Sequence, residues 1–373
     1  MDFLGINLDK LFNASDNSNP LMWLVWIVPL VIFMFYGQRI QLQITSSEIS
    51  KSLDKLKTFK EETRKELLEY IKTTIKPRTD PTSKIDRFFE HFTIMPVDMD
   101  PNGMVPKVIH LVRSREDYIR QQVRALSPEL TSLEASKIEN ILEAATSLHL
   151  LYKIVRHIFL TAKKQNNFPL ILPLQMMMPF IMEEAEALKT AVSAFKRGQP
   201  IGDGIGPMVV GKMMLGMEKK TVAFETIWSQ SEFEGRKLYL MKAEGPSAAL
   251  GRPGDALEKI ISENRPDIIV MVDAALKMEG EESGSIAQGF GAAIGGIGTD
   301  RFQIEEVATK HKIPVYAIVI KQSIKEAITL MRKEIADSVE KVTSQVHEII
   351  RENTKASQSA LVIGVGNTLG VSQ

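Results

Sequence analysis

Ile201-Gly-Asp-Gly-Ile-Gly-Pro-Met-Val-Val210 places one carboxylate, that of Asp203, among three glycines and shortly before a proline. The three glycines are Gly202, Gly204 and Gly206. Glycines let a backbone turn tightly and leave amide N–H groups uncovered. Pro207 is favoured in the first turn of a helix, which the apolar residues behind it continue. We therefore expect Asp203 to lie on an exposed turn beside a helix N-terminus, open to a ligand. The alternative is an ordinary N-cap aspartate.

Strands and helices alternate on the C-terminal side of this stretch. Apolar runs predict strands at 221–227, 237–243, 267–273, 314–320 and 360–365, with helices at 256–263 and 325–353. Continuous apolar runs are typical of strands that are buried on both faces. We therefore predict an α/β domain over residues 199–373, with a mostly parallel sheet in a three-layer arrangement.

Two further polar stretches follow predicted strands. Asp273 closes an apolar run, and Gly364-Val-Gly-Asn367 follows the last strand. Ligands of open α/β sheets bind outside the carboxyl ends of the strands, so both stretches are candidates for a site. Alternatively, Asp273 only caps the next turn. A dinucleotide fingerprint would need glycine where Leu369 stands, and no Walker A sequence occurs, so nucleotide binding is not predicted.

The N-terminal region contains a long uncharged segment. Residues 20–36 carry no charge, which predicts a transmembrane helix at 20–37 with residues 1–19 outside the cytoplasm. Basic residues follow the segment, which favours a single-pass protein whose bulk is cytoplasmic. The alternative is a buried core helix.

Helical patterns fill the region between this segment and the α/β domain. Residues 38–76 read as one long helix with a 4-3 apolar spacing, which predicts either a coiled-coil stalk and a homo-oligomer or a helix packed on its own chain. Residues 84–198 are expected to form a helical domain. Within it, the uncharged and proline-containing segment 168–182 is interpreted as a buried or membrane-interfacial stretch, with a buried contact favoured.

The composition excludes several classes of function. The 46 basic and 46 acidic residues cancel, which gives no support for nucleic-acid binding. The chain has no cysteine, so disulfides, thiolate metal sites and a cysteine nucleophile are excluded. Its six histidines do not form the H-E-x-x-H pattern of a zincin.

The glycine and aspartate stretches resemble the hydrogenase-maturation endopeptidases. In that family a strand ending in G-x-G-N-x-L leads into D-[DE]-G-[IV]-G-P, and a later strand ends in D-A. Here the order differs, because Val362–Leu369 stands at the C-terminus while Gly202–Pro207 comes first. The resemblance implies a circularly permuted form of the phosphorylase/hydrolase-like fold, which close termini would allow. It also implies that strand 360–365 is central in the sheet and brings Gly364–Asn367 directly beside Gly202–Gly206.

The middle of this region is similar to the spore germination protease of the same fold group. Its K-P-D-F-V-I-A-I-D-A-L-A segment resembles Arg265–Leu276, and its I-P-V-I-A-I strand resembles Ile313–Ile318. The likeness covers roughly residues 200–373. The whole architecture also resembles an uncharacterised archaeal membrane-protein family of unknown function.

Carried over to this sequence, the resemblance implies that Asp203 and Asp273 are catalytic. Two facing carboxylates do not both ionise easily, so the pair could hold and deprotonate a water that attacks a peptide carbonyl. A divalent metal on the two aspartates is an alternative, although the loop Gly289–Gly298 lacks the histidine that the hydrogenase-type relatives add. The glycine-rich loops would supply backbone amides to an anion or an oxyanion. Their candidate residues are Gly202, Gly204, Gly206, Gly295, Gly296, Gly364, Gly366 and Asn367.

Three functions therefore remain open. The first is a membrane-anchored peptidase or other hydrolase that depends on the two aspartates. The second is a membrane-anchored module that binds a peptide or a small anionic ligand without turnover. The third is a scaffold in which stalk and helical region form an oligomer and the α/β domain has lost its activity.

Overall fold

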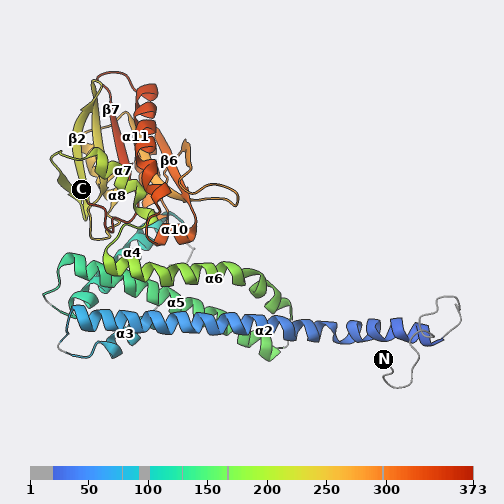
Figure 1. Cartoon of the computed structure of the whole chain (residues 1–373). Coiled ribbons are helices and arrows are strands. Elements are labelled where there is room, and N and C mark those ends of the chain that lie inside the picture. Colours follow the sequence, from blue (N-terminus) through green and yellow to red (C-terminus); the bar gives the residue numbers. More distant parts are fainter. Residues whose placement is uncertain are drawn as a thin grey trace. The chain divides into compact units, whose positions relative to one another are not determined.

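The computed structural model describes residues 20–77, 79–91, 101–127, 129–165, 168–295 and 298–372 (Figure 1). The chain forms two compact units. One contains Met1–Lys57 and Tyr152–Met182, and the other contains Thr58–Leu151 and Glu183–Gln373. The two units share three long helices, and each unit is described by itself below.

Long helices make up the N-terminal half. They are α2 (Pro20–Thr74), α3 (Thr82–Phe89), α4 (Pro101–Arg124), α5 (Ser132–Gln165) and α6 (Phe168–Arg197). The segment 168–182 is a regular part of α6, in spite of Pro173 and Pro179. It is buried only on one side, because Ile171, Leu174 and Met178 are covered whereas four apolar residues are exposed. The exposed residues are Leu172, Met176, Met177 and Phe180.

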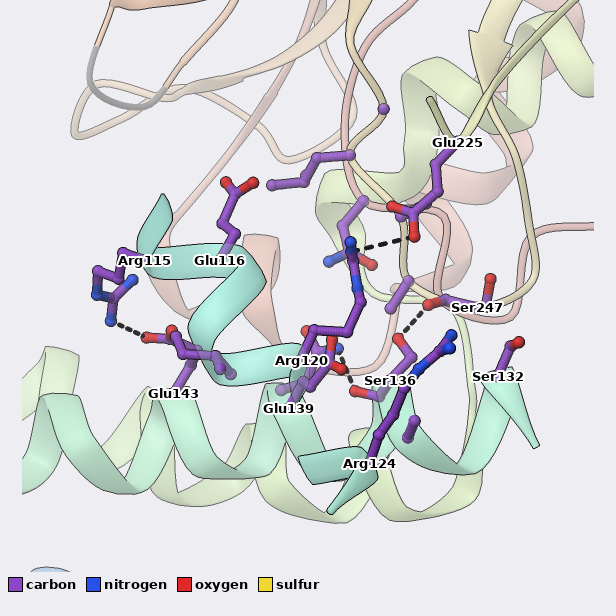
Figure 2. Close-up of a pocket in the computed structure, with 18 of the residues that line it drawn as sticks. Arg115, Glu116, Arg120, Arg124, Ser132, Ser136, Glu139, Glu143, Glu225 and Ser247 are labelled. Carbon is purple, nitrogen blue, oxygen red and sulfur yellow. Dashed lines mark hydrogen bonds and ion pairs between the residues drawn. The ribbon is translucent and has the colours of Figure 1, made fainter. Parts of the chain in front are cut away.

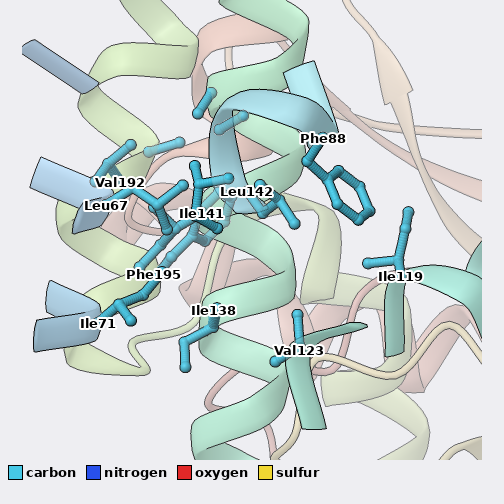
Figure 3. Packing of buried hydrophobic residues seen from close by; sticks show 14 of the residues in the cluster. Leu67, Ile71, Phe88, Ile119, Val123, Ile138, Ile141, Leu142, Val192 and Phe195 are labelled. Carbon is cyan, nitrogen blue, oxygen red and sulfur yellow. The ribbon is translucent and has the colours of Figure 1, made fainter. Parts of the chain in front are cut away.

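The second unit packs the C-terminal end of α2 against other helices of the same chain. Figure 3 shows Leu67 and Ile71 of α2 among Ile138 and Ile141 of α5 and Phe195 of α6. Ion pairs between Lys196 and Glu66, at 2.8 Å, and between Lys189 and Glu62 flank this contact. Of the two alternatives for the stalk, the helix packed on its own chain therefore holds for this part of α2. Its apolar seam is occupied and is not free for a coiled-coil partner.

The predicted transmembrane segment lies partly outside the described residues. Residues 1–19 are not described, and neither are the side chains of residues 20–26, 35 and 36. Within the part of the chain that the structure does describe, no helix combines the length and the apolar composition needed to cross a membrane.

The C-terminal half contains a seven-stranded sheet in the order β1-β2-β3-β7-β4-β6-β5. The strands are β1 (Lys220–Ala223), β2 (Thr226–Phe233), β3 (Arg236–Ala243), β4 (Ile268–Leu276), β5 (Ile286–Phe290), β6 (Val315–Gln322) and β7 (Ser359–Gly364). β3, β7, β4 and β6 pair in parallel, while β1, β2 and β5 pair antiparallel at the two edges. The sheet is therefore mixed, and the prediction of a mostly parallel sheet was wrong for its edges. The prediction that strand 360–365 is central is confirmed.

Helices cover both faces of this sheet. α7 (Ile205–Met213) and α11 (Lys333–Asn353) pack on one face, against side chains such as Leu240, Val270 and Val362. α8 (Pro253–Glu263) and α9 (Thr299–His311) pack on the other, against Met271 and Ile363. Neighbouring residues of one strand thus contribute to opposite cores, as the alternation of side chains in a strand requires.

Two predicted elements have different boundaries, and one strand was not predicted. The predicted strand 221–227 is two strands joined by a turn at Glu225, whose φ of 48° reverses the chain. The predicted helix 325–353 is divided into α10 (Ile324–Ile328) and α11. Between them Leu330 forms a β-bridge with Ile201. β5 was not predicted, because it is an exposed edge strand that contains Gly289.

Candidate active site and an adjoining cavity

Asp203 lies on a single 3-10 turn beside the N-terminus of α7, as the glycine pattern predicted. The prediction that this turn is exposed was wrong, because Gly202 and Gly204 are buried and burial raises the pKa of Asp203. The N-cap of α7 is Gly204, so Asp203 is not an N-cap aspartate either. Gly202–Gly204 forms the turn and Ile205 begins the helix. The close approach of other backbone explains the third glycine. A Cβ on Gly206 would lie 2.3 Å from the carbonyl oxygen of Val365 and 2.4 Å from that of Val272. Glycine therefore lets the start of α7 rest directly on the ends of β7 and β4.

The turn after β7 holds the side chain of Asp203. The backbone N–H of Asn367 donates a 2.8 Å hydrogen bond to Oδ2 of Asp203. Gly366 has a φ of 130°, and a Cβ there would lie 1.9 Å from the carbonyl oxygen of Asp203. The predicted contact between Gly364–Asn367 and Gly202–Gly206 is thereby confirmed. Half of the proposed site is built from segments at opposite ends of the domain sequence.

Asp273 lies on β4 but does not close it. The strand continues to Leu276. The ladder between β4 and β7 ends at the pair Val272–Gly364, one residue before Asp273. Asp273 is only 5% exposed. The backbone N–H of Ala274 donates to its Oδ1 at 2.7 Å, and the N–H of Gly295 also donates to this carboxylate. Asp273 is therefore held by its own strand and by the glycine-rich loop rather than acting as a cap.

The charge of Asp203 acts on the Asp273 carboxyl group. Burial raises the pKa of Asp273 well above its ordinary value, and the negative charge of Asp203 raises it further. Burial also raises the pKa of Asp203, an effect opposed by the hydrogen bond from Asn367. Like charges in a desolvated site favour a singly protonated pair. Such a pair offers one proton donor and one proton acceptor.

The glycine-rich loop contributes less to the described site than predicted. Gly295 donates to Asp273, whereas Gly296 lies outside the described residues. Gly289 belongs to the edge strand β5. Among the described residues, no group of three or more histidine, aspartate or glutamate side chains is placed to hold a metal ion.

A second buried charge lies at the carboxyl end of β3. Lys242 is 1% exposed, and its Nζ donates to the carbonyl oxygen of Ala243 at 2.9 Å. Burial lowers the pKa of Lys242 to about 8. Lys242 pairs in register with Gly364 of β7, next to the strand end that carries Asn367. Lys242 could not be selected from the sequence, because a single lysine in an apolar strand belongs to no motif.

A cavity of about 320 Å³ adjoins the turn that holds Asp203 (Figure 2). α4 and α5 line one side of it, and three turns of the α/β domain line the other. The turns contribute Glu225, residues 247–252 and Asn367. Asn367 thus belongs to both places, since its N–H binds Asp203 while the residue forms part of the cavity wall.

The cavity is lined by four arginines and four glutamates. The arginines are Arg115, Arg120, Arg124 and Arg252, and the glutamates are Glu116, Glu139, Glu143 and Glu225. Arg115 pairs with Glu143 at 2.9 Å, Arg120 pairs with Glu225 at 3.1 Å, and Arg252 pairs with Glu116. This cavity was not predicted, because its charged residues come from four segments that are distant in the sequence.

The comparisons with known proteins can be set beside this geometry. Residues 23–198 match a family model described as the N-terminal domain of a protein of unknown function (DUF1512), and residues 201–372 match the corresponding C-terminal domain. The chain belongs to the DUF1512 family. The two models together cover both the helical region and the α/β domain, and they meet at the glycine stretch that contains Asp203. A search of curated proteins gave no match.

Proposed function

We propose that this DUF1512 protein is a hydrolase in which Asp203 and Asp273 activate a water molecule, with peptides as the substrate class. The observation that carries the proposal is the effect of Asp203 on its buried neighbour, since burial and the charge of Asp203 raise the pKa of Asp273. Strongly perturbed acids at the carboxyl ends of parallel strands are typical of functional sites. The motif resemblance to endopeptidases, in a permuted order, supports a peptide bond as the target.

The environment of each carboxyl group suggests its role. The Asn367 N–H stabilises an ionised Asp203, which suits the proton acceptor. Asp273 is the more strongly buried acid and suits the proton donor. A water between them would lose a proton to Asp203 as its oxygen attacks the peptide carbonyl carbon. Asp273 would protonate the carbonyl oxygen, which gives a gem-diol. When the C–N bond breaks, Asp203 would pass its proton to the leaving amine, and Asp273 would take back the proton of one hydroxyl group.

Two substitutions test the proposed chemistry. Asp203→Asn and Asp273→Asn keep the side-chain shape and remove the acid, so each should lower the rate of peptide hydrolysis at least about 100-fold. Asp337→Asn, on the exposed face of α11, is the matched control and should keep full activity. The rate would be followed with a fluorogenic peptide library and the purified full chain. Turnover by either active-site variant at the rate of the control would contradict the proposal.

We further propose that the hydrolase is bound to a membrane. The uncharged segment 20–36 supports this, and so does the exposed apolar surface of α6 described above. In addition, residues 144–182 contain no acidic residue but include Lys153, Arg156, Lys163 and Lys164. Basic and apolar side chains together favour an anionic lipid surface. The full chain should therefore remain in the membrane pellet after alkaline extraction, and its recovery in the supernatant would contradict this.

A binding protein without turnover is the second candidate. The cavity beside Asn367 favours it, because a space of this size with several polar groups suits a small ligand whether or not hydrolysis occurs. Binding without any hydrolysis by the full chain would favour this candidate over the first.

A further inference from the structure

One guanidinium group in the cavity forms no ion pair or hydrogen bond with a described residue, although its charge lowers the pKa of Glu139. Three of the four arginines form the ion pairs described above, but no described residue forms an ion pair or a hydrogen bond with the Arg124 side chain. Arg124 lies at the end of α4 and is exposed on the side away from the Arg115–Glu143 pair (Figure 2). An unpaired arginine facing a cavity is suited to bind a carboxylate in a two-point contact.

One carboxyl group in the cavity likewise lacks an ion pair with a described residue, although the charges of Arg120 and Arg124 act on it. Glu139 of α5 makes no ion pair with a described residue, although it lies between Ser136 and Glu143 on the cavity side of its helix. Ser136 donates its hydroxyl to the carbonyl oxygen of Ser247, which ties α5 to the α/β domain beside Glu139. Glu139 is half-buried, and its neighbours Ser136 and Glu143 are bonded to Ser247 and Arg115.

We propose that the cavity binds the carboxylate of a small ligand, which Arg124 pairs with and to which Glu139 donates a hydrogen bond. The cavity is large enough for one amino-acid residue or a short peptide end, and it is at the small end of the range of ligand sites. The chemistry would be the same for a free acylated amino acid and for the C-terminus of a peptide. Serine and asparagine side chains, Ser132 and Asn140 among them, provide further polar groups on the wall.

The charges around Glu139 make this binding depend on pH. Burial raises the pKa of Glu139 to about 7, Arg120 and Arg124 lower it, and Glu225 and Glu143 raise it. The remaining charged groups on the wall are Arg115, Glu116 and Arg252. A bound carboxylate adds another negative charge and favours protonated Glu139. Binding therefore takes up a proton, and the affinity falls as the pH rises through about 7.

This inference does not rest on the proposed hydrolysis, since it concerns equilibrium binding to other residues. Loss of binding in a cavity variant that retains Asp203 and Asp273 would bear on the binding proposal and not on the proposed hydrolysis. Conversely, Asp273→Asn should bind the ligand normally even if it abolishes turnover, so failure of one proposal can be distinguished from failure of the other.

Calorimetric titration of the full chain with N-acetyl-leucine and with N-acetyl-leucine amide tests the proposal. The acid should bind at least about tenfold more tightly than the amide, because only the acid offers a carboxylate to Arg124. Its affinity should fall about tenfold between pH 6 and pH 8, following the protonated fraction of Glu139. Acetyl-Ala-Ala-Leu separates the two sources of the carboxylate. Tighter binding of this peptide indicates a chain terminus, and weaker binding indicates a free acid.

Two variants and one control complete the experiment. Arg124→Gln should weaken binding of the acid at least about tenfold, and Glu139→Gln should retain binding with the pH dependence removed. Arg351→Gln removes an exposed guanidinium that pairs with Glu234 elsewhere on the domain, and it should bind like the wild type. Equal affinity for acid and amide, or unchanged binding by Arg124→Gln in a protein with a normal melting curve, would overturn the proposal.

Discussion

The aspartate pair and the arginine–glutamate cavity are neighbours, but they differ in whether buried charges have partners of opposite sign. In the cavity most charges are matched, as in the 3.1 Å pair between Arg120 and Glu225. In the aspartate pair two acidic groups lie near each other, and none of the interactions that shift their pKa values comes from a cation. Matched charges hold the helical region to the α/β domain. Unmatched like charges destabilise a fold, so their presence points to a role in chemistry.

The largest expected effect comes from breaking the geometry of the aspartate pair. Gly366→Ala would place a Cβ 1.9 Å from the carbonyl oxygen of Asp203 at a backbone φ of 130°. We expect a loss of about 3–5 kcal/mol in the free energy of unfolding, measured by urea denaturation. Gly235→Ala is the control, since its φ is 74° but its Cβ would meet only an ordinary contact at 3.7 Å. That variant should lose about 1 kcal/mol. Equal losses would show that the close approach is unimportant.

An intermediate effect on the free energy of unfolding is expected at Lys242, where burial shifts the pKa without the repulsion present in the aspartate pair. Lys242 is buried, and its pKa falls from 10.5 to about 8. The main cause of this shift is burial and not a neighbouring positive charge. Between about pH 8 and pH 10.5 Lys242 is protonated in the unfolded chain but largely neutral in the folded protein. The free energy of unfolding of the wild type therefore rises with pH over this window. Lys242→Met should be more stable than the wild type by up to about 3 kcal/mol at pH 7. The difference should shrink towards pH 10, and its persistence there would contradict a charge effect.

The smallest effect is expected for a matched pair in the cavity. Arg120→Met removes the partner of Glu225 and a guanidinium that stacks 4.8 Å from the centre of the Phe224 ring. Both partners are partly exposed, so we expect a loss of about 1 kcal/mol in the free energy of unfolding. A double-mutant cycle with Glu225→Gln measures the coupling between the two charges. A coupling of zero would mean that the cavity charges do not hold the two regions together.

The same comparison explains what the sequence can predict. The turn with Asp203 follows from a local signal, because three glycines and a proline constrain their own neighbourhood. The contact with Asn367 was predicted from the motif resemblance, since no local pattern joins two stretches so far apart in the sequence. The cavity depends on α4, α5 and three turns, and none of these segments carries a pattern that refers to the others. The surroundings of Arg124 and Glu139 could therefore not be inferred from the sequence.

Long-range contacts also explain the errors in element boundaries. Residues 329–332 have a helical pattern, but the backbone there bonds to the glycine stretch instead. Met331 donates its N–H to the carbonyl oxygen of Pro200 at 2.8 Å, and Leu330 bridges to Ile201. These bonds end the helix early and place Gly202 against α10. The local propensity for helix was overridden by tertiary structure.

The most direct test of the account is the titration of the Asp273 carboxyl carbon by NMR, in the wild type and in Asp203→Asn. The account predicts that the pKa of Asp273 lies well above its ordinary value of 3.8 in the wild type and falls when the Asp203 charge is removed. Because the folded pKa is raised, the stability contributed by protonated Asp273 should be lost as the pH rises from about 4 through the folded pKa. An Asp273 that titrates near 4, or is unaffected by Asp203→Asn, would contradict a shared proton and with it the proposed hydrolase.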